Sequence, residues 1–502
     1  MTLHQPLLCR LETECSIVPP SKLKYWDEMK RPIINTVQEY DVPIDNPCNQ
    51  STATYLSMIN TEVLRSGIVR PKGYNVSWHL NPEVEKHHFG VEHPMKPFRL
   101  TLTKSLVMSY GMHVAMDSYL SRMATPEELT EFDTSDYIDF LQSAMPQYSP
   151  EEDPGAFGLN GQDCPLFEGL FEHCSLHAGA SIDAARKLVN NQSDIAINWS
   201  GGLHHAKKDS ASGFCYINDV VLAILQLLRY HPRVLYIDID VHHGDGVEQD
   251  FWSSDRVMTL SFHNYDPPDF FPCTGDIGTT GPKNPYNPGA HHALNVPLND
   301  GISDSQYSTI FKIVVNKCIE HYRPAAIVLQ CGADSLAGDR IGTFNLQVKA
   351  HAACVSFCKR LNLPLLLLGG GGYIPRNVAR AWALETAVAI GCDKMLDREI
   401  PAHTPYRSYF GPPVLCPTFA ELKFRPNVNE NTDKQLDAIV AAISEQLRYV
   451  KGAPSVQMQM IPPDIGRIRQ AVEERLQEER EQKDAGLRRG RESGIGVSGE
   501  LW

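Results

Sequence analysis

The stretch that most constrains the fold is Arg233–Asp245, in which a short apolar run ends in acidic and imidazole side chains. Its first half, Val234–Ile239, is typical of a buried strand. Asp238, Asp240 and His242 then alternate along the chain, and side chains two residues apart in extended chain point the same way. A polar strand end is the ordinary interpretation of such residues, but here they directly extend an apolar run, where an unpaired charge is costly. The stretch therefore indicates a metal site or an ion-pair network.

Helical patterns and apolar runs alternate along the chain after Tyr74, where we expect regular structure to begin. The apolar runs are not interrupted by alternating polar residues, which predicts a mostly parallel sheet with helices on both faces. Thr125-Pro-Glu-Glu128 is a capping box and predicts a helix start. We expect strands at 194–199, 234–239, 257–262, 325–329 and 363–368, and helices at 100–122, 166–190, 218–229, 306–321 and 347–361.

Each of the five predicted strands is followed by polar residues or glycines that are uncommon after an apolar run. The segments are Gly201–His205, Asp240–Asp245, His263–Tyr265, Gln330–Asp334 and Gly369–Tyr373. Ligands of parallel α/β sheets bind outside the carboxyl ends of the strands. We therefore expect these segments to form one site.

The composition describes an ordinary globular chain, with 42% hydrophobic and 21% charged residues. A net charge of −14 argues against broad contact with nucleic acid phosphates and favours a cationic or protein partner. The start of the chain lacks the pattern of a signal peptide, and no apolar run approaches a membrane span. The 13 cysteines are scattered without a Cys-x-x-Cys pair, which is typical of reduced thiols in the cytosol or nucleus.

One large α/β domain, residues 74–463, is expected between two extensions. Residues 1–73 are expected to be partly disordered, with an amphipathic pattern around Tyr55–Leu64. In residues 464–502, apolar residues at spacings of three and four within a run of Glu and Arg predict a short charged helix, followed by a disordered glycine-rich end.

Asp240, His242 and Asp334 form a carboxylate–imidazole–carboxylate set without a thiolate. Three protein ligands leave positions open for water and substrate, as in catalytic metal sites. The ligand types suit zinc, and iron or manganese are also compatible.

A histidine pair, His204-His205, follows two glycines that let the backbone approach this site closely. Such a pair is about as often packed or exposed as catalytic. Two further acids, Asp238 and Asp245, are not needed as ligands, and each could fix the tautomer of one histidine. The pattern indicates a metal-bound water with a histidine base beside it.

Tyr373 follows four glycines, which could suggest a phosphate cradle, but no Gly-Lys-Ser/Thr follows them. A phenol brought to a metal site is instead a donor for a developing oxyanion, although alone Tyr373 would be an ordinary turn residue. Phe214 and Phe271 lie on predicted loops. Loop aromatics usually belong to the core, but two of them near a polar site could wall a narrow channel.

Five motifs give the sequence a close resemblance to class I zinc-dependent histone deacetylases, over about residues 74–463. It looks most like the fungal members that act in corepressor complexes. The family's single arginase-like α/β domain agrees with the predicted sheet. The motifs are Gly201-Gly-Leu-His-His-Ala-Lys-Lys208, Ser212-Gly-Phe-Cys-Tyr216, Tyr236-Ile-Asp-Ile-Asp-Val-His-His-Gly-Asp-Gly246, Gln330-Cys-Gly-Ala-Asp334 and Gly369-Gly-Gly-Gly-Tyr373.

The resemblance implies a role for each matching residue. His205 would act as general base and acid, His204 as its electrostatic partner, and Tyr373 would polarise the acetyl carbonyl. Zinc would be held by Asp240, His242 and Asp334, and the acetyl-lysine tunnel would be lined by Gly213, Phe214 and Phe271. Asp163 would grip the substrate backbone at the rim. The resemblance also implies potassium near the Asp238 strand and an inositol phosphate at His88, Lys96, Arg340 and Arg376.

Three departures from the family pattern stand out. Cys273 occupies a position near the tunnel wall where the family usually has glycine. Glu92 lies where relatives place glycine or a basic residue, beside the expected phosphate pocket. The N-terminal extension has no counterpart in typical members.

The activity implied is hydrolysis of N6-acetyl-lysine in histone tails, releasing acetate, as part of transcriptional repression within a corepressor complex. The expected location is the nucleus, with some cytoplasmic protein also compatible. The expected partners are acetylated histone tails and corepressor proteins, without direct binding to nucleic acid or membrane.

One alternative is an arginase-like or polyamine-directed hydrolase of the same fold, but a second metal would need ligands that we cannot assign. The other is a non-catalytic corepressor scaffold, against which the intact metal set, histidine pair and Tyr373 argue.

Overall fold

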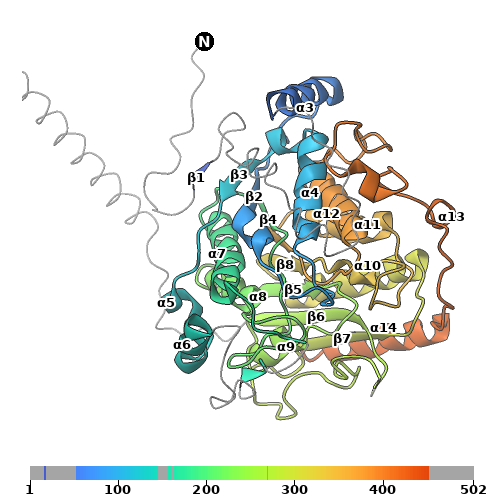
Figure 1. Cartoon of the computed structure of the whole chain (residues 1–502). Coiled ribbons are helices and arrows are strands. Elements are labelled where there is room, and N and C mark those ends of the chain that lie inside the picture. Colours follow the sequence, from blue (N-terminus) through green and yellow to red (C-terminus); the bar gives the residue numbers. More distant parts are fainter. Residues whose placement is uncertain (1–15, 18–51, 145–156, 160–162, 268, 452–502) are drawn as a thin grey trace, which may run out of the picture. The chain divides into compact units, whose positions relative to one another are not determined.

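The computed structural model describes residues 16–17, 52–144, 157–159, 163–267 and 269–451. Within them, nine strands form one sheet in the order β1-β3-β2-β4-β9-β8-β5-β6-β7 (Figure 1). Every neighbouring pair is parallel except β1 and β3. The strands are β1 Ser16–Ile17, β2 Val76–Leu80, β3 Asp117–Leu120, β4 Ile195–Asn198, β5 Val234–Asp238, β6 Val257–Asn264, β7 Ala293–Leu298, β8 Ala326–Gln330 and β9 Leu365–Leu368.

Helices cover both faces of the sheet, which explains why its central strands are apolar without alternation. Along β5, Leu235 and Ile237 pack in the core cluster that includes α10, α11 and α12, whereas Val234 and Tyr236 pack in the cluster that includes α7 and α8. The predicted α/β class is thereby confirmed. The helices are α3 Thr52–Ser66, α4 Phe98–Ser109, α5 Pro126–Leu129, α6 Ser135–Ser143, α7 Leu170–Val189, α8 Asp219–Leu228, α9 Asp245–Asp250, α10 Asp304–Tyr322, α11 Val348–Arg360, α12 Pro375–Ile390, α13 Phe419–Leu422 and α14 Asp433–Leu447.

The prediction of one helix over 100–122 was wrong. Helix α4 ends at Ser109, and Gly111 then adopts a left-handed conformation with φ 72°. A Cβ atom at Gly111 would lie 2.7 Å from a Val63 methyl group, so this close turn requires glycine. The chain continues through the 3-10 turn Met112–Ala115 into β3, which pairs with β2.

Regular structure also begins before Tyr74, contrary to expectation. The amphipathic pattern around Tyr55–Leu64 is part of helix α3, and Tyr55 and Ile59 of that helix are buried in the core. The charged helix expected after Pro463 lies outside the described residues.

The capping box that begins α5 is present as predicted. Glu128 N donates to Thr125 Oγ1 over 3.3 Å, and Thr125 N donates to Glu128 Oε2 over 3.0 Å. The same carboxylate also pairs with Arg122 and Arg186, so the cap anchors two cationic side chains.

Thr125→Ala should lower the free energy of unfolding by about 1 kcal/mol, because the cap bond to the Glu128 amide is lost. Urea unfolding followed by circular dichroism measures the change. Thr130→Ala is the matched control, since the exposed Thr130 hydroxyl only donates to the Glu127 carbonyl oxygen. A loss at Thr125 no larger than at Thr130 would show that the cap does not stabilise the fold.

Candidate metal centre and active site

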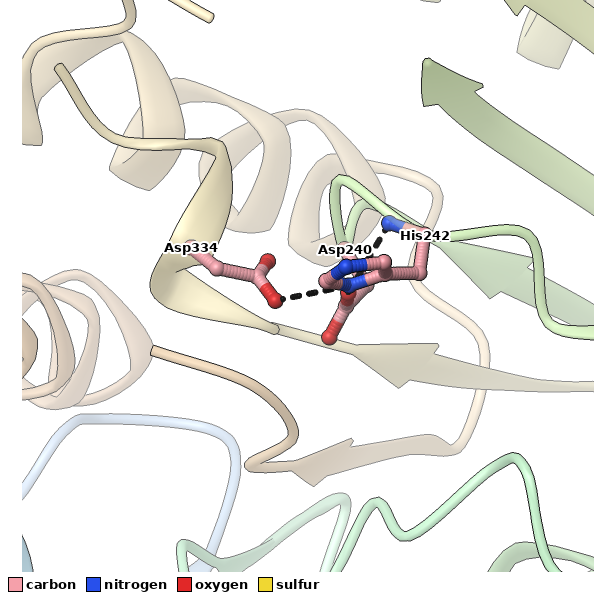
Figure 2. A group of neighbouring side chains, drawn as sticks. All are labelled: Asp240, His242 and Asp334. Atoms are coloured by element: carbon pink, nitrogen blue, oxygen red, sulfur yellow. Dashed lines mark hydrogen bonds and ion pairs between the residues drawn. The ribbon is translucent and has the colours of Figure 1, made fainter. Parts of the chain in front are cut away.

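Three buried side chains that could hold a metal ion meet at the carboxyl edge of the sheet (Figure 2). Asp240 and His242 lie on the loop after β5, and Asp334 lies in the 3-10 turn Ala333–Ser335 that follows β8. His242 Nδ1 is 3.0 Å from Asp240 Oδ1 and 3.1 Å from Asp334 Oδ2. The fold thus brings together side chains that are 92 residues apart in sequence.

The chemistry and spacing of this donor set fit a zinc ion. Tetrahedral ligands at the usual zinc distances are about 3.3 Å apart, close to the separations observed here. Burial and the neighbouring charge of Asp240 raise the pKa of the Asp334 carboxyl. A cation between the two carboxylates would relieve that repulsion and leave positions open for water and substrate.

The second oxygen of each carboxylate is held by the surrounding loops. Asp240 Oδ2 accepts from Gln330 Nε2 over 2.9 Å and from Gly371 N over 2.8 Å. Asp334 Oδ1 accepts from Val241 N over 2.9 Å. A Cβ at Gly371 would lie 2.0 Å from Asp334 Oδ2, so the glycine run lets the backbone reach the ligands. The remaining oxygens are therefore oriented toward the His242 ring.

The histidine pair lies beside these residues, and each ring contacts one of the two spare aspartates. His204 Nδ1 is 2.6 Å from Asp238 Oδ2, and His205 Nδ1 is 2.7 Å from Asp245 Oδ1. Because each Nδ1 faces a carboxylate, the proton of a neutral ring resides on Nδ1 and Nε2 is the basic atom. The two ring centroids are 4.0 Å apart.

His204 and His205 have different surroundings, which shift their pKa values in opposite directions. Burial alone would lower the pKa of His204, but the carboxylates of Asp238 and Asp240 outweigh it and raise the pKa to about 9. Burial and the positive charge of His204 lower the pKa of His205 to about 3, against the effect of Asp245. His205 is therefore the neutral ring at pH 7, and its Nε2 can accept a proton.

Tyr373 is 7% exposed and lies at the end of the glycine run, directly before α12. Burial, followed by the charges of Asp334 and Asp240, raises the pKa of its phenol well above the ordinary value, so the hydroxyl keeps its proton. The Tyr373 amide donates to Asp339 Oδ2 over 2.8 Å, which fixes the backbone of this residue. The phenol is thus available as a hydrogen-bond donor.

The residues expected to line a channel flank the rings of His205 and Tyr373. The Phe271 ring lies 4.9 Å from the His205 ring, and the Phe214 ring lies 5.6 Å from the Tyr373 ring. A Cβ at Gly213 would lie 2.5 Å from His205 Cδ2, so only glycine fits there. The exposed Asp163 accepts from Gly213 N over 3.0 Å through Oδ2, which leaves its other oxygen toward solvent.

The backbone at Cys273 has a conformation that glycine adopts readily. Its φ is 65°, in the left-handed region that glycine adopts most readily, and its amide donates to the Phe270 carbonyl oxygen over 2.9 Å. The side chain is exposed.

The four residues expected to contact an inositol phosphate lie on three segments of the chain. His88 Nδ1 accepts from Gly90 N, and Lys96 Nζ donates to the Val91 carbonyl oxygen, so both belong to one local turn. Arg340 follows Asp334 on the loop after β8, and Arg376 lies in the first turn of α12; both are exposed. The bond from the Tyr373 amide to Asp339 joins the residues next to these two arginines. The shared role of the four residues stays a prediction.

Three further residues act on the site without having been predicted. Gln330 holds Asp240, as described above, and the Phe270 ring stacks on the His242 ring at a centroid distance of 5.1 Å. Arg99 is buried and donates to the Gly372 carbonyl oxygen over 2.9 Å. Gln330 stood inside one of the motifs quoted above, and Phe270 directly precedes the predicted channel residue Phe271, whereas nothing in the local sequence marked Arg99.

The end of β6 packs beside the metal-site loop after β5. Asn264 N donates to the Val241 carbonyl oxygen over 2.8 Å, and the His263 ring lies 4.7 Å from the His243 ring. This segment supports the loop after β5, whereas the other four strand ends supply the predicted site residues directly.

Comparisons with known proteins give one consistent result. Residues 93–389 match the sequence model of the histone deacetylase domain. The chain is 50% identical over 392 residues to human histone deacetylase 1, covering 78% of each chain. It is 51% identical over 395 residues to histone deacetylase 9 of Arabidopsis thaliana, covering 78% of this chain and 89% of that protein. Histone deacetylase B of Dictyostelium discoideum is 50% identical over 392 residues, covering 78% and 90%.

None of the helices in the described part of the chain has the length and apolar character needed to cross a membrane.

Proposed function

Because the chain belongs to the histone deacetylase family, we propose that it hydrolyses the amide of N6-acetyl-lysine in histone tails through zinc held by Asp240, His242 and Asp334. The observation that carries the proposal is the convergence of this buried donor set with the His205–Asp245 pair. Zinc bound there would polarise the acetyl carbonyl and lower the pKa of a water molecule.

His205 has the geometry of the general base. Its Nδ1 faces Asp245, so Nε2 takes a proton from the attacking water and later delivers it to the departing lysine amine. Lys207 Nζ, 2.5 Å from Asp245 Oδ2, keeps that aspartate ionised. The cationic His204 then stabilises negative charge that develops on the substrate.

Tyr373 donates its phenol hydrogen to the carbonyl oxygen as that oxygen gains negative charge. Asp163 binds the substrate backbone with its solvent-facing oxygen, while Gly213, Phe214 and Phe271 enclose the apolar lysine stem. Hydrolysis consumes one water and yields acetate and the free amine.

Acetate release from an acetyl-lysine peptide of a histone tail tests this proposal. We expect turnover that is lost on treatment with a zinc chelator and restored by added zinc. An acetylated polyamine and free arginine are the control substrates. Faster turnover of either of these would assign the site to the alternative hydrolases, and zinc binding without any turnover would assign it to a scaffold.

The family resemblance also suggests where the chain acts, in which complex, and which further ion it binds. We propose that the chain acts in the nucleus in repression of transcription, in a corepressor complex of the fungal type, with potassium bound near the Asp238 strand. The fully buried Asp238 carboxylate offers oxygen ligands of the kind that such a hard cation takes. Copurification from nuclear extract with its complex, and the dependence of activity on potassium concentration, test these points separately.

An inositol phosphate bound by His88, Lys96, Arg340 and Arg376 is the proposed regulator. Arg340 follows Asp334 by six residues, and Arg376, in the first turn of α12, follows Tyr373 by three, so an anion between the two arginines would stiffen both catalytic segments. The exposed Glu92 places a negative charge on the loop of His88 and Lys96.

Inositol hexakisphosphate should therefore stimulate the chain in its partner complex, and Glu92→Gly should lower the half-maximal concentration several-fold, because one repulsive charge near the anion is removed. Glu168→Gly provides a control at another exposed glutamate. Titration of deacetylase activity measures the response. A flat titration with both the native chain and Glu92→Gly would contradict this regulatory role.

A further inference from the structure

A fully buried imidazole and carboxylate lie behind the metal-site loop and have no part in the proposed reaction. His351 belongs to α11 and Glu385 to α12, and both side chains are 0% exposed. His351 Nδ1 forms a short contact with Glu385 Oε1, and His351 Nε2 lies 2.8 Å from the Gly332 carbonyl oxygen. The pair thus connects two helices to one peptide group of the loop after β8.

The direction of these bonds follows from the atoms involved. A carbonyl oxygen only accepts, so the proton on this side must reside on His351 Nε2. One further proton is shared between His351 Nδ1 and Glu385 Oε1, whichever of the two atoms holds it. Glu385 therefore keeps His351 in the form that donates to Gly332.

Two peptide groups meet at Gly332, and both are bonded near the carboxylates of the metal site. One carries the Gly332 amide, and the other joins Gly332 to Ala333 and carries the carbonyl group that His351 contacts. Gly332 N donates to Gln330 Oε1 over 2.7 Å, which turns the Gln330 amide nitrogen toward Asp240 Oδ2 at 2.9 Å. Asp334 follows two residues later. Ala333 N donates to the Gly371 carbonyl oxygen over 3.0 Å, so the loop is anchored on both sides.

We propose that His351 and Glu385 are positioning residues, which fix the Gly332 peptide and thereby hold Asp240 and Asp334 in the arrangement that binds the metal. The part that concerns the metal rests on the proposed function. Packing alone would not require this pair, because apolar side chains of similar volume can fill such a space without the cost of burying ionisable groups.

Residue 332 also lies against the Asp240 carboxylate. A Cβ built on Gly332 would lie 1.9 Å from Asp240 Oδ2, so the backbone of residue 332 adjoins this carboxylate while His351 holds the carbonyl group of the same residue. A shift of this carbonyl group is therefore expected to move the backbone that adjoins Asp240.

Two measurements on the full chain test the proposal. Zinc affinity is obtained by competition with a chromophoric chelator, and hydrogen exchange of residues 330–336 is followed by mass spectrometry in the metal-free protein. His351→Ala should weaken zinc binding 10- to 100-fold, as loss of a group that orients metal ligands usually does. It should also accelerate amide exchange in this loop.

Glu385→Gln is the conservative variant. Its amide donates to His351 Nδ1 and keeps the proton on Nε2, so zinc affinity should stay within about threefold of the native value. Glu385→Leu keeps the volume but removes the acceptor, and it should weaken zinc binding as His351→Ala does, which preserves the comparison if His351→Ala does not fold.

His79→Ala controls for the loss of a buried imidazole. His79 is also 0% exposed but lies on β2, where it contacts the Ser77 hydroxyl and the Tyr119 ring. This variant should keep native zinc affinity and native exchange in residues 330–336.

Native zinc affinity and loop exchange in the folded His351→Ala and Glu385→Leu variants would overturn the proposal. So would a loss in His79→Ala equal to that in His351→Ala, or a loss in Glu385→Gln equal to that in Glu385→Leu. Failure of the proposed function is seen separately, as a native chain that does not deacetylate while zinc affinity and loop exchange still respond to His351→Ala.

Discussion

Asp334→Ala should leave the protein with little bound zinc and on the order of a thousandfold less deacetylase activity, and Asp240→Ala should do the same. Each substitution removes one of the three side chains proposed to hold the metal, and each removed carboxylate is buried, so solvent cannot easily replace it. Zinc content after desalting and acetate release from an acetyl-lysine peptide measure the two effects.

Asp133→Asn is the matched control for loss of a buried carboxyl group. Asp133 is 2% exposed, and burial raises the pKa of its carboxyl well above the ordinary value, so an amide closely replaces the protonated acid. This variant should retain zinc and activity. Full zinc content and activity in both Asp240→Ala and Asp334→Ala would falsify the assignment of the metal site.

The sequence was sufficient to predict the sheet class and the edge where the site lies, because the central strands carry the signal of double burial and end in conspicuous polar segments. The strand β7, Ala293–Leu298, was missed since Asn295 and Pro297 interrupt its apolar pattern. The helix expected over 100–122 ends at Ser109, and the left-handed Gly111 that follows is a helix-stop signal that the prediction did not use. The close approach of Val63 to residue 111 is a tertiary contact that local pattern cannot report.

Some contacts of the candidate site could likewise be predicted from the sequence, and others could not. Asp240 and His242 are two residues apart in one loop, so local spacing predicts their proximity. Counting acids and imidazoles at one edge predicts that each histidine faces one spare aspartate, but only the structure assigns Asp238 to His204 and Asp245 to His205. The roles of Arg99 and His351 depend instead on backbone carbonyl groups of distant loops. A carbonyl acceptor leaves no signature in side-chain sequence, and only the fold reveals it.

Tyr373→Phe should lower turnover about 100- to 1000-fold while zinc content and the binding of a hydroxamate inhibitor persist. The substitution removes one donor hydroxyl from a buried site. It leaves the bond from the residue 373 amide to Asp339 and the contact with the Phe214 ring in place. Single-turnover kinetics on an acetyl-lysine peptide, with metal analysis of the same sample, measure the effect.

The kinetic pattern separates a donor to the transition state from a turn residue. A hydrogen bond that strengthens only as the carbonyl oxygen gains charge raises kcat, so its loss should lower kcat and kcat/KM together with little change in KM. Tyr307→Phe is the control, since Tyr307 is a 1% exposed core tyrosine whose hydroxyl has no hydrogen-bond partner within the described residues. It should turn over like the native chain. If turnover of Tyr373→Phe also stays within a few-fold of native, Tyr373 only closes the turn before α12, and carbonyl polarisation must then be assigned to the metal and His204 alone.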